Sequence, residues 1–568
     1  MGEQTTRLSR EEVAKAEIGR TDVGAPLARL MAFVFLATIS AVPVAQHVHD
    51  IVAYSAGERC SPWPQCYDIF RGVASSARVG ARAEGSLVDR VFAANRALLA
   101  DIHRYEDALQ DESLLHGCVL PPAQRVLCAL GVGNEKAYVG RDGWLFYRAG
   151  VDYVTGPGFL DRVRLANRAR TGSEWKSPPQ GDPRKAVLQF KQQLDSRGIA
   201  LILMPTPDKA MIHPEQFSSA YKDVGRVLQN PSFEQFRREL EGRGVLVFDV
   251  SQALVDAKRR AAQYLKTDTH WRPEAMELAA AELRRFIQER VGLPDRPPVQ
   301  YVRRELEVEN LGDIAVMLNL PGNQALYPKE KALIHPVFTP RNVVWDQSRS
   351  ADVLFLGDSF SNVYSLESMN WGYCAGLVEQ LSCELKRPLD RIIRNDDGAY
   401  ATRQILSREL ARGRDRLAGK RLVIWQFAVR ELSTGDWKML DMTLGEQRPT
   451  RFLTIPRGKG TIVSGVILSI SRPPRPPQPY RDCLVCLHLA DLETEDALLP
   501  GGEALVYMFG MRDNAWTAAA RYRVGDRIRL RLTNWNDTPP GYDRLWRSPL
   551  EEPAVELEEP CWGEATEK

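Results

Sequence analysis

Two short segments of this 568-residue chain contain residue types that together perform nucleophilic chemistry. In the first segment, Asp268 and His270 lie two positions apart. In an extended segment such residues share one face, so the carboxylate can orient the imidazole and stabilise its charged form. The alternative is a structural histidine, held by a capping aspartate ahead of a helix that begins at Pro273.

The second segment places a serine directly after a strand. The apolar run Val353–Leu356 leads into Gly357, Asp358 and Ser359. Glycine permits a tight turn that presents Ser359 at the carboxyl end of the strand. A helix starting close behind would offer backbone N–H groups to an oxyanion. His270 could then take the proton of Ser359 and return it to a leaving oxygen. The alternative is that Ser359 only caps that helix.

Between residues 183 and 430, short apolar strands alternate with helices, and this pattern predicts an α/β fold with a mainly parallel sheet covered on both faces. Sites in such sheets lie at the carboxyl ends of the strands. Asp142 and Gly143 predict a hairpin turn, and Ser251 is expected to cap a helix. The predicted strands are 199–204, 245–250, 353–356, 391–394 and 422–427, and the predicted helices are 185–196, 233–240, 273–289, 371–385 and 402–412.

The N-terminal region contains a membrane signal. Residues Leu30–Ala45 carry no charge, and the apolar stretch extends back to Leu27 because Arg29 can reach the interface. Basic residues precede it, so the positive-inside tendency leaves the N-terminus in the cytoplasm and exports the rest of the chain. An uncleaved anchor and a cleaved secretory signal both remain open.

Five regions follow along the chain. They are a cytoplasmic tail (1–26), an anchor or signal (27–48), a helical and loop extension (49–134), an α/β domain (135–445) and a β-rich module (450–568) that could be a sandwich or a barrel. The tryptophans and tyrosines of this module could stack on sugar rings or form its core. They are Trp516, Trp535, Trp546, Trp562, Tyr507, Tyr522 and Tyr542.

Composition narrows the class of protein. The chain is 44% hydrophobic and 26% charged, an ordinary globular balance, and its net charge of +2 gives no reason to expect a nucleic-acid partner. The close pairs Cys60/Cys66 and Cys118/Cys128 suit local disulfides in an oxidising compartment. The Cys483/Cys486 pair lacks a second pair for zinc, so we expect no metal site and no cofactor.

These segments together resemble a known family. The run Asp268–Trp271 (DTHW), followed about ninety residues later by Leu356–Ser361 (LGDSFS), is similar to the alginate O-acetyltransferase group of SGNH hydrolase-like proteins. Gly140–Tyr147, Met204–Glu215 and Trp425–Leu432 match further segments of that group, in the same order. The resemblance covers about residues 135–440. Ordinary SGNH enzymes place the Asp/His motif after the serine, whereas the acetylating group places it before, as here.

The resemblance implies an SGNH hydrolase-like, doubly wound fold in which Ser359 is the nucleophile, His270 the base and Asp268 its orienter. It also implies a polysaccharide acceptor, acetyl supplied through a membrane O-acyltransferase partner (MBOAT-type), contacts with other exopolysaccharide secretion proteins, and a periplasmic location. Gln426 and His213 depart from the usual Glu and Tyr of the family. The candidate oxyanion and substrate residues are Asn362, Gly372, Arg430, Lys209 and Trp271.

Three functions therefore compete. The first is an O-acetyltransferase that acts on an exported polysaccharide through an acetyl-serine intermediate. The second is an esterase with the same triad, in which water replaces the sugar hydroxyl. The third is a non-catalytic glycan-binding scaffold of a secretion complex, in which the C-terminal module binds the polymer.

Overall fold

The computed structural model forms two compact units, one of Met1–Arg71 with Asp101–Cys118 and one of Gly72–Ala100 with Val119–Lys568. Residues 1–23 of the predicted cytoplasmic tail, together with Cys60 and Cys66, lie outside the described residues. The structure describes residues 24–55, 73, 76–77, 80–81, 86–111, 113–171, 178–221, 225–395, 398–446, 452–471, 473, 481–494, 498–539, 541–542, 545–548, 550, 555 and 558–566.

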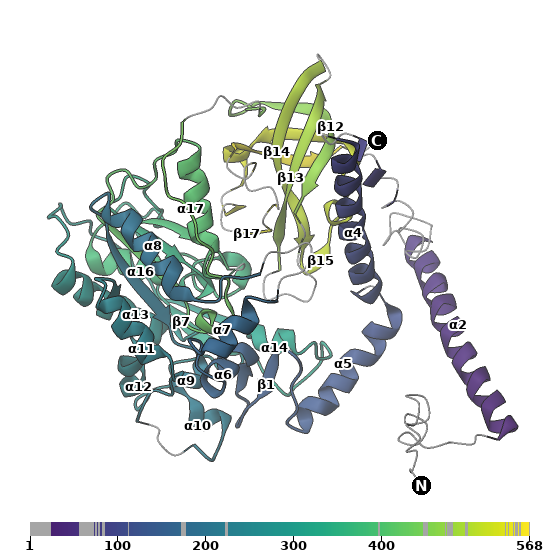
Figure 1. Cartoon of the computed structure of the whole chain (residues 1–568), viewed down its shortest axis with the longest axis horizontal. Helices are drawn as coiled ribbons and strands as arrows, with labels where there is room; N and C mark the ends of the chain where they lie inside the picture. The colour runs from purple at the N-terminus through teal and green to yellow at the C-terminus, as the bar shows by residue number, and fades with distance from the viewer. Residues whose placement is uncertain are drawn as a thin grey trace, which may run out of the picture. The chain divides into compact units, whose positions relative to one another are not determined.

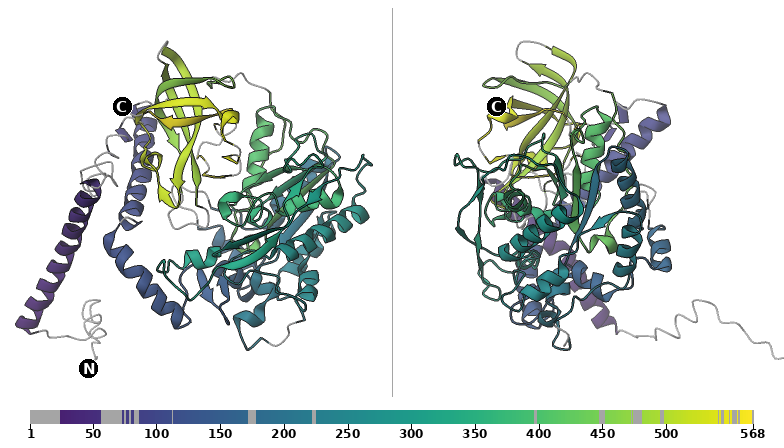
Figure 2. Two further views of the ribbon diagram at one scale, coloured as in Figure 1. Left: turned by 180° about the vertical axis from the view of Figure 1, so that it is seen from behind. Right: turned by 90° about the vertical axis from the view of Figure 1, so that its left-hand side faces the viewer.

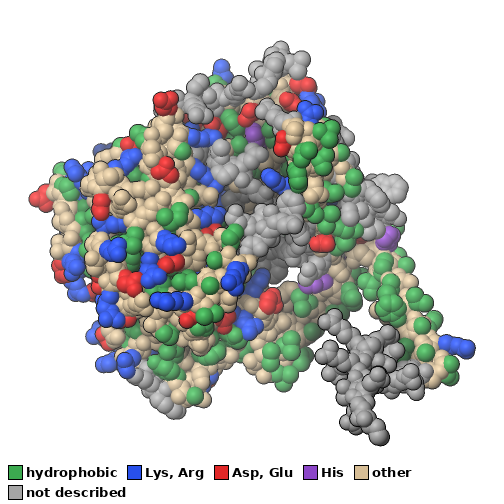
Figure 3. All heavy atoms as spheres, viewed as in Figure 1, with side chains coloured by type: hydrophobic (Ala, Val, Ile, Leu, Met, Phe, Trp, Pro, Cys, Tyr) green, Lys and Arg blue, Asp and Glu red, His purple; other side chains and the backbone are tan. Residues whose placement is uncertain are grey.

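The first unit contains the helix α2 (Ala25–Ser55), which covers the predicted anchor. Within it, Ala25–Val52 is long and apolar enough to cross a membrane, with a mean hydropathy of 2.0. Large apolar side chains such as Leu30, Phe33 and Phe35 are exposed along this helix, which is mostly green in Figure 3. An exposed apolar helix of this length fits a membrane anchor.

The second unit is built on a five-stranded parallel sheet with the strand order β10-β9-β11-β3-β4. Its central strand β11 is buried along its whole length. A strand buried on both faces favours apolar side chains at most positions, which explains the apolar runs in the sequence. The strands are β3 (Ala200–Thr206), β4 (Leu246–Val247), β9 (Val353–Gly357), β10 (Asp390–Ile393) and β11 (Leu422–Ala428).

Helices cover both faces of this sheet (Figure 1). On one face lie α8 (Pro183–Asp195), α11 (Phe233–Glu241) and α17 (Ala401–Ala411), which pack on β3, β4 and β9. On the other face α13 (Pro273–Arg290) packs against α16 (Leu377–Leu385). Right-handed crossovers between neighbouring parallel strands produce this two-sided arrangement. The predicted doubly wound α/β fold is confirmed.

The remaining elements are shorter or peripheral. Asp142 and Gly143, both at positive φ, form the predicted hairpin between β1 and β2. The bounds are α4 (Leu87–Asp111), α5 (Leu114–Ala129), β1 (Ala137–Val139), β2 (Leu145–Tyr147), α6 (Arg148–Thr155), α7 (Arg162–Arg168), α9 (Lys209–Ile212), α10 (Pro214–Phe217), α12 (Ser251–Ala257), β5 (Val302–Arg303), β6 (Leu306–Asn310), α14 (Asp313–Met317), β7 (Glu330–Ile334), β8 (Val337–Phe338), α15 (Ser359–Asn362) and α18 (Glu431–Thr434).

Some local predictions were wrong. The helix predicted to begin at Trp371 begins at Leu377, because the preceding residues form a turn in which Gly372 has φ +101°. Ser251 is the first residue of α12, and its hydroxyl bonds Asp249 instead of capping the helix. Cys118 and Cys128 form no disulfide, since both lie on α5, where ten residues of helix hold them apart.

The C-terminal module is a closed β-barrel, which decides between the two predicted forms. Pairing runs β14-β18-β16-β12-β13 and returns from β13 to β14 (yellow-green in Figure 2). Tyr507, Trp546 and Trp562 are each less than 10% exposed, so these three aromatic residues pack inside the fold. The strands are β12 (Gly460–Ile470), β13 (Cys483–Thr494), β14 (Leu498–Arg512), β15 (Ala515–Trp516), β16 (Arg527–Asn534), β17 (Trp546–Arg547) and β18 (Pro560–Ala565).

Candidate active site

The structure brings Ser359, His270 and Asp268 into one hydrogen-bonded row. Nε2 of His270 lies 2.9 Å from Oγ of Ser359, and Nδ1 of His270 lies 2.7 Å from Oδ1 of Asp268. His270 and Asp268 are buried, whereas Ser359 is half-buried. The imidazole therefore bridges a buried carboxylate and a hydroxyl that solvent can reach. This is the geometry in which a base can activate a hydroxyl for attack.

The turn after β9 sets the position of Ser359. Ser359 begins α15, and Asp358 caps this helix by accepting a hydrogen bond of 2.9 Å from the N–H of Phe360. The other oxygen of Asp358 accepts from the N–H of Ala428, at the end of β11, at 2.6 Å. The capping residue is therefore Asp358, not Ser359, and it ties the serine turn to the neighbouring strand.

Gln426, on the neighbouring strand β11, fixes the same turn. Its Nε2 donates to Asp358 and to Thr206, and its Oε1 accepts from the N–H of Asp358 and from the hydroxyl of Ser361. All four distances lie between 2.6 and 3.0 Å. An amide supplies two donors and two acceptor sites, so this buried group is fully satisfied. Gln426 thus serves as a bridge among β11, β3 and the serine turn.

The carboxylate of Asp268 is held by four N–H groups. Oδ1 accepts from the backbone and the ring of His270, while Oδ2 accepts from Nε1 of Trp371 at 2.9 Å and from the N–H of Asp313 at 3.0 Å. Burying an ionised carboxylate is costly unless donors replace its water shell. These donors keep Asp268 ionised and fix the direction in which it faces the imidazole.

Trp271 joins the two motifs directly. Its indole Nε1 donates to the carbonyl of Phe360, next to Ser359, at 3.0 Å. Its own carbonyl accepts a hydrogen bond of 2.6 Å from the hydroxyl of Tyr364. Trp271 is fully buried. It therefore positions the histidine segment against the serine helix from the interior.

A second carboxylate lies beside the imidazole. Asp313 Oδ2 is 3.7 Å from Nδ1 of His270, and Asp313 Oδ1 accepts from the N–H of Thr269 at 2.6 Å. Burial, followed by the charge of Asp268, raises the pKa of Asp313 to about 6. Burial opposes the charged form of His270, yet Asp268 and Asp313 outweigh it and raise the pKa of His270. The pKa of Asp268 is lowered because its bonds to His270 outweigh burial.

The donor set of this cluster does not suit a metal ion. Asp268, His270 and Asp313 offer one ligand atom each within 4.8 Å of one another. The two oxygens of Asp268 already accept four hydrogen bonds, and Nδ1 of His270 points at one of them. A cation would have to displace these N–H donors, so the cluster fits proton transfer better than metal binding.

The other candidate residues lie in different surroundings. Arg430 binds the buried Asp208 at 2.5 Å, and its guanidinium lies 5.6 Å from the ring of Phe360. Lys209 is buried, and its amine donates to the carbonyls of Leu145 and Lys266. It therefore braces the segment before Asp268 from the interior.

Two further candidates flank the serine helix and the turn that follows it. Asn362, at the end of α15, donates to Asn395 at 3.1 Å. Gly372 has a positive φ, and a Cβ there would lie 2.2 Å from Ile334. Glycine is therefore needed for the turn that carries Trp371 toward Asp268.

Sequence reasoning gave no supporting role to four residues that hold the row in place, although it had named Asp358 and Gln426. The four residues are Asp313, Trp371, Asp358 and Gln426. Only Asp358 carried a local signal, as an aspartate directly before the first turn of a helix. Trp371 reaches Asp268 across 103 residues, and no spacing in the sequence announces such a contact.

Comparison with known proteins agrees with this architecture. A family model described as "SGNH hydrolase-like domain, acetyltransferase AlgX" matches residues 137–429, just over half of the chain. The chain therefore belongs to the family of SGNH hydrolase-like domains of the AlgX acetyltransferase type.

Curated relatives match over the same region. The "Probable alginate O-acetylase AlgJ" of Pseudomonas aeruginosa is 28% identical over 267 residues, which cover 44% of this chain and 61% of that protein. The protein of the same name from Pseudomonas syringae pv. tomato is 25% identical over 264 residues, which cover 44% of this chain and 60% of that protein. The match thus spans less than two thirds of these relatives.

Solved structures are similar at lower identity. The O-acetyltransferase domain of Pseudomonas putida AlgJ is 18% identical with a TM-score of 0.39, and the match covers 53% of this chain and 93% of that one. AlgX of Pseudomonas aeruginosa is 14% identical with a TM-score of 0.38, and the match covers 71% of this chain and 92% of that one.

Proposed function

We propose that the chain is a serine-dependent O-acetyltransferase that modifies a polysaccharide outside the cytoplasm. The observation that carries the proposal is the contact of 2.9 Å between His270 Nε2 and the half-buried hydroxyl of Ser359. Membership of the acetyltransferase family supports acyl transfer as the reaction. The names of the curated relatives support a polysaccharide acceptor.

The reaction proceeds in two acyl transfers. Oγ of Ser359 attacks the carbonyl carbon of a donor acetyl group while its proton passes to His270 Nε2, and the donor's leaving oxygen departs with that proton. A sugar hydroxyl then attacks the acetyl-serine, giving its proton to His270. The tetrahedral intermediate collapses, and Ser359 recovers the proton as the acetyl ester of the sugar leaves. Asp268 stabilises the imidazolium in both halves.

The oxyanion of each intermediate needs nearby donors. The backbone N–H of Ser359 stands at the first position of α15, where a helix leaves its N–H groups without intrahelical partners. We propose it as one oxyanion donor, with Asn362, Gly372 and Arg430 as candidates for the second. Of these, Asn362 lies on the same helix as the serine.

The apolar helix α2 and the family of the catalytic unit suggest where the protein acts and with which partners. We propose that α2 anchors the chain in the membrane and that the catalytic unit faces the periplasm, where a membrane O-acyltransferase of the MBOAT type supplies acetyl. Other exopolysaccharide secretion proteins complete this assembly. Protease treatment of spheroplasts tests the orientation: the catalytic unit should be digested without lysis, and protection until lysis would contradict it.

Acetyl transfer by the full chain in detergent tests the proposed reaction. A small activated acetyl ester serves as donor and an oligosaccharide as acceptor, and mass spectrometry follows both the acceptor and the protein. Wild-type protein should gain one acetyl group on Ser359 and pass it to the sugar, and Ser359→Ala should do neither. Ser407→Ala is the control, because this hydroxyl on α17 donates to the carbonyl of Asp441 and takes no part in the network around the serine turn.

Three outcomes separate the candidate functions. Acetylated sugar together with an acetyl-Ser359 intermediate supports the transferase. Acetate release without sugar modification favours an esterase with the same three residues. Wild-type protein that neither acetylates the sugar nor releases acetate leaves the glycan-binding scaffold, whereas acetylation by Ser359→Ala at the wild-type rate contradicts the assigned role of Ser359.

A further inference from the structure

The helix α5 presents an apolar face to solvent. Val119, Val126 and Leu130 follow at intervals of seven and four residues, so they lie on one stripe of the helix and of the turn that ends it. Val126 is 60% exposed and Leu130 is 73% exposed. The exposed residues of this stripe, called here the outer face of α5, are Val119, Pro122, Ala123, Val126, Leu127 and Leu130. All six are apolar, whereas the solvent side of a helix in a globular protein is normally polar.

The opposite side of α5 is bound to the second unit. Gln124 and Cys128 are buried there, and Gln124 donates to a backbone carbonyl at 3.2 Å. Cys128 packs in a hydrophobic cluster with Ile314 of α14, which lies beside α5 (Figure 1). The helix α14 begins at Asp313, whose N–H donates to Asp268 at 3.0 Å. The outer face is therefore turned away from the protein, and α14 connects its helix to the candidate active site.

The start of α5 lies beside the apolar helix α2. Within the first unit, the backbone N–H of Leu114 donates to Oε1 of Gln46 at 2.8 Å. Gln46 directly follows the uncharged run Leu30–Ala45 and lies near the C-terminal end of the candidate membrane span Ala25–Val52. With the basic N-terminal tail in the cytoplasm, this end of α2 faces outward. The helix α5 then begins at the level where α2 leaves the bilayer.

The charge pattern of α5 suits lipid. Residues 114–132 contain one charged side chain, that of Arg125, and no carboxylate. An interfacial helix buries its apolar face about 5–10 Å deep at the boundary between headgroups and acyl chains, while basic side chains reach anionic headgroups. A protein interface usually surrounds its apolar centre with polar groups, and this segment offers few of them. The composition of the outer face therefore favours lipid over a protein partner.

We propose that the outer face of α5 lies on the outward surface of the bilayer that α2 spans. The anchor keeps α5 close to this surface, so the effective concentration of lipid is high and a weak affinity is sufficient. Through Cys128 and α14, the docked helix also fixes how the candidate active site is turned toward the membrane. This orientation matters if a membrane-embedded donor supplies acetyl, and that consequence rests on the proposed function. The lipid contact itself requires no reaction at Ser359.

Photolabelling from within the bilayer tests the contact. The full chain is reconstituted in liposomes of phosphatidylcholine and phosphatidylglycerol that contain a phosphatidylcholine with a diazirine in its acyl chain. After illumination, mass spectrometry locates the lipid adducts. Residues 119–132 should carry adducts, as should α2. The peptide with Val343, which is 58% exposed in the loop after β8, should carry none and shows whether exposure alone is sufficient for labelling.

Charges on the outer face should prevent the contact. The double variant Val126→Asp, Leu130→Asp should reduce the adducts on residues 119–132 about tenfold and leave those on α2 unchanged, because a charged side chain opposes burial in lipid. The matched control Val343→Asp should reduce neither. Ser359→Ala should be labelled like the wild type, which separates this test from the proposed chemistry. Thermal unfolding checks that the variants are folded.

Three results would overturn the inference. The first is a wild-type map without adducts on residues 119–132, which would leave the outer face to a second copy of the chain or to another protein. The second is equal labelling of the Val343 peptide. The third is unchanged labelling of residues 119–132 in the folded double variant.

Discussion

His270 Nε2 lies 2.9 Å from Ser359 Oγ, although 89 residues separate the two in the chain. Two features of the fold create this contact. The parallel sheet brings Ser359 to the carboxyl end of β9, and Trp271 attaches the histidine segment to the backbone of the next residue, Phe360. The proposed chemistry depends on this contact between the end of β9 and the loop that carries His270. The side chains that hold the contact can each be tested by substitution.

Asp268→Asn should lower the turnover number for acetyl transfer by roughly a thousandfold to ten-thousandfold. The amide cannot stabilise the imidazolium, and it favours the wrong tautomer of His270. Steady-state kinetics with the activated acetyl ester measures the loss. A change of less than tenfold would contradict the assigned role of Asp268.

Trp371→Phe should reduce turnover about tenfold, because it removes one of the N–H donors that fix Asp268. The matched control is Trp437→Phe, which loses a similar indole bond, to the carbonyl of Glu431, without touching Asp268. Both variants should lose stability, but only Trp371→Phe should lose turnover after correction for the folded fraction. Equal losses in the two variants would leave Trp371 with a purely structural role.

The pH profile should report the charge state of His270. The imidazole must be neutral to accept a proton, and Asp268 and Asp313 raise its pKa against the effect of burial. The rate should therefore fall on acidification with a midpoint above the ordinary histidine pKa of 6.5. Asp313→Asn removes one charge that raises this pKa, so its midpoint should move to lower pH. The exposed Asp195→Asn is the control, and an unmoved or higher midpoint in Asp313→Asn would refute the assignment.

Gln426→Glu should destabilise this chain at neutral pH. An ionised carboxylate at position 426 would face the carboxylate of Asp358 where the amide now donates at 2.8 Å. Burial and that charge raise the folded-state pKa of the new acid, so the variant is more stable in acid and loses stability as pH rises through that pKa. Denaturant unfolding at pH 8 should show a loss of about 1–3 kcal/mol that shrinks at pH 5. The exposed Gln288→Glu should change little, and an equal loss at both pH values would contradict the charge argument.

Arg430 and Asp208 form a buried ion pair. Replacing Arg430 alone should destabilise the fold, and replacing Asp208 as well should reverse part of that loss. Arg430→Met should cost about 3–5 kcal/mol of unfolding free energy, because Asp208 is left buried without its partner. Adding Asp208→Asn removes the stranded charge, so the double variant should recover part of that loss. Denaturant titration of the three variants measures the coupling, and strictly additive losses would show that the pair is not coupled.

Local sequence pattern predicted the main architecture, and it drew attention to Asp268, His270 and Ser359 as residues that could act together. The buried strands β3, β9 and β11 are continuous apolar runs, and Asp268 and His270 share a face because they lie two positions apart. The turn at Trp371–Gly376 could not be found in this way. Its sequence is compatible with a helix, but the contact of Trp371 with Asp268 and the positive φ of Gly372 and Cys374 hold it in a turn.

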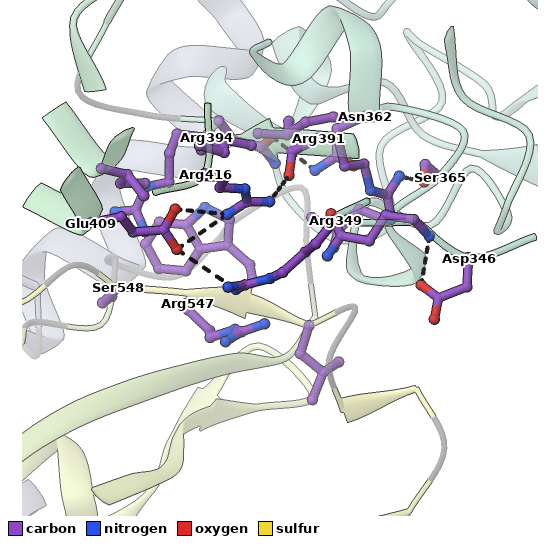
Figure 4. A pocket seen from close by; sticks show the side chains of 18 of the residues that line it. Asp346, Arg349, Asn362, Ser365, Arg391, Arg394, Glu409, Arg416, Arg547 and Ser548 are labelled. Atoms are coloured by element: carbon purple, nitrogen blue, oxygen red, sulfur yellow. Dashed lines mark hydrogen bonds and ion pairs between the residues drawn. The ribbon is translucent and has the colours of Figure 1, made fainter. Parts of the chain in front are cut away.

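The barrel and the pocket beside it are further features that local sequence pattern does not predict. The strand β13 contains the Cys483/Cys486 pair, which raised the question of metal binding. In the structure residues 483–489 of this strand are buried, and the strand pairs with β12 and β14. The arginines that line the pocket between the sheet domain and the barrel (Figure 4) lie between Arg349 and Arg547 and form no run in the sequence. Only tertiary packing collects them.

Labelling of the nucleophile tests the central claim most directly. Full-length protein is treated with a serine-reactive fluorophosphonate or sulfonyl fluoride, and the modified peptide is identified by mass spectrometry. We expect one adduct per chain, on Ser359, and a rate of labelling at least a hundredfold lower in His270→Ala, because the base is gone. Absence of an adduct on Ser359, or labelling of His270→Ala at the wild-type rate, would contradict it.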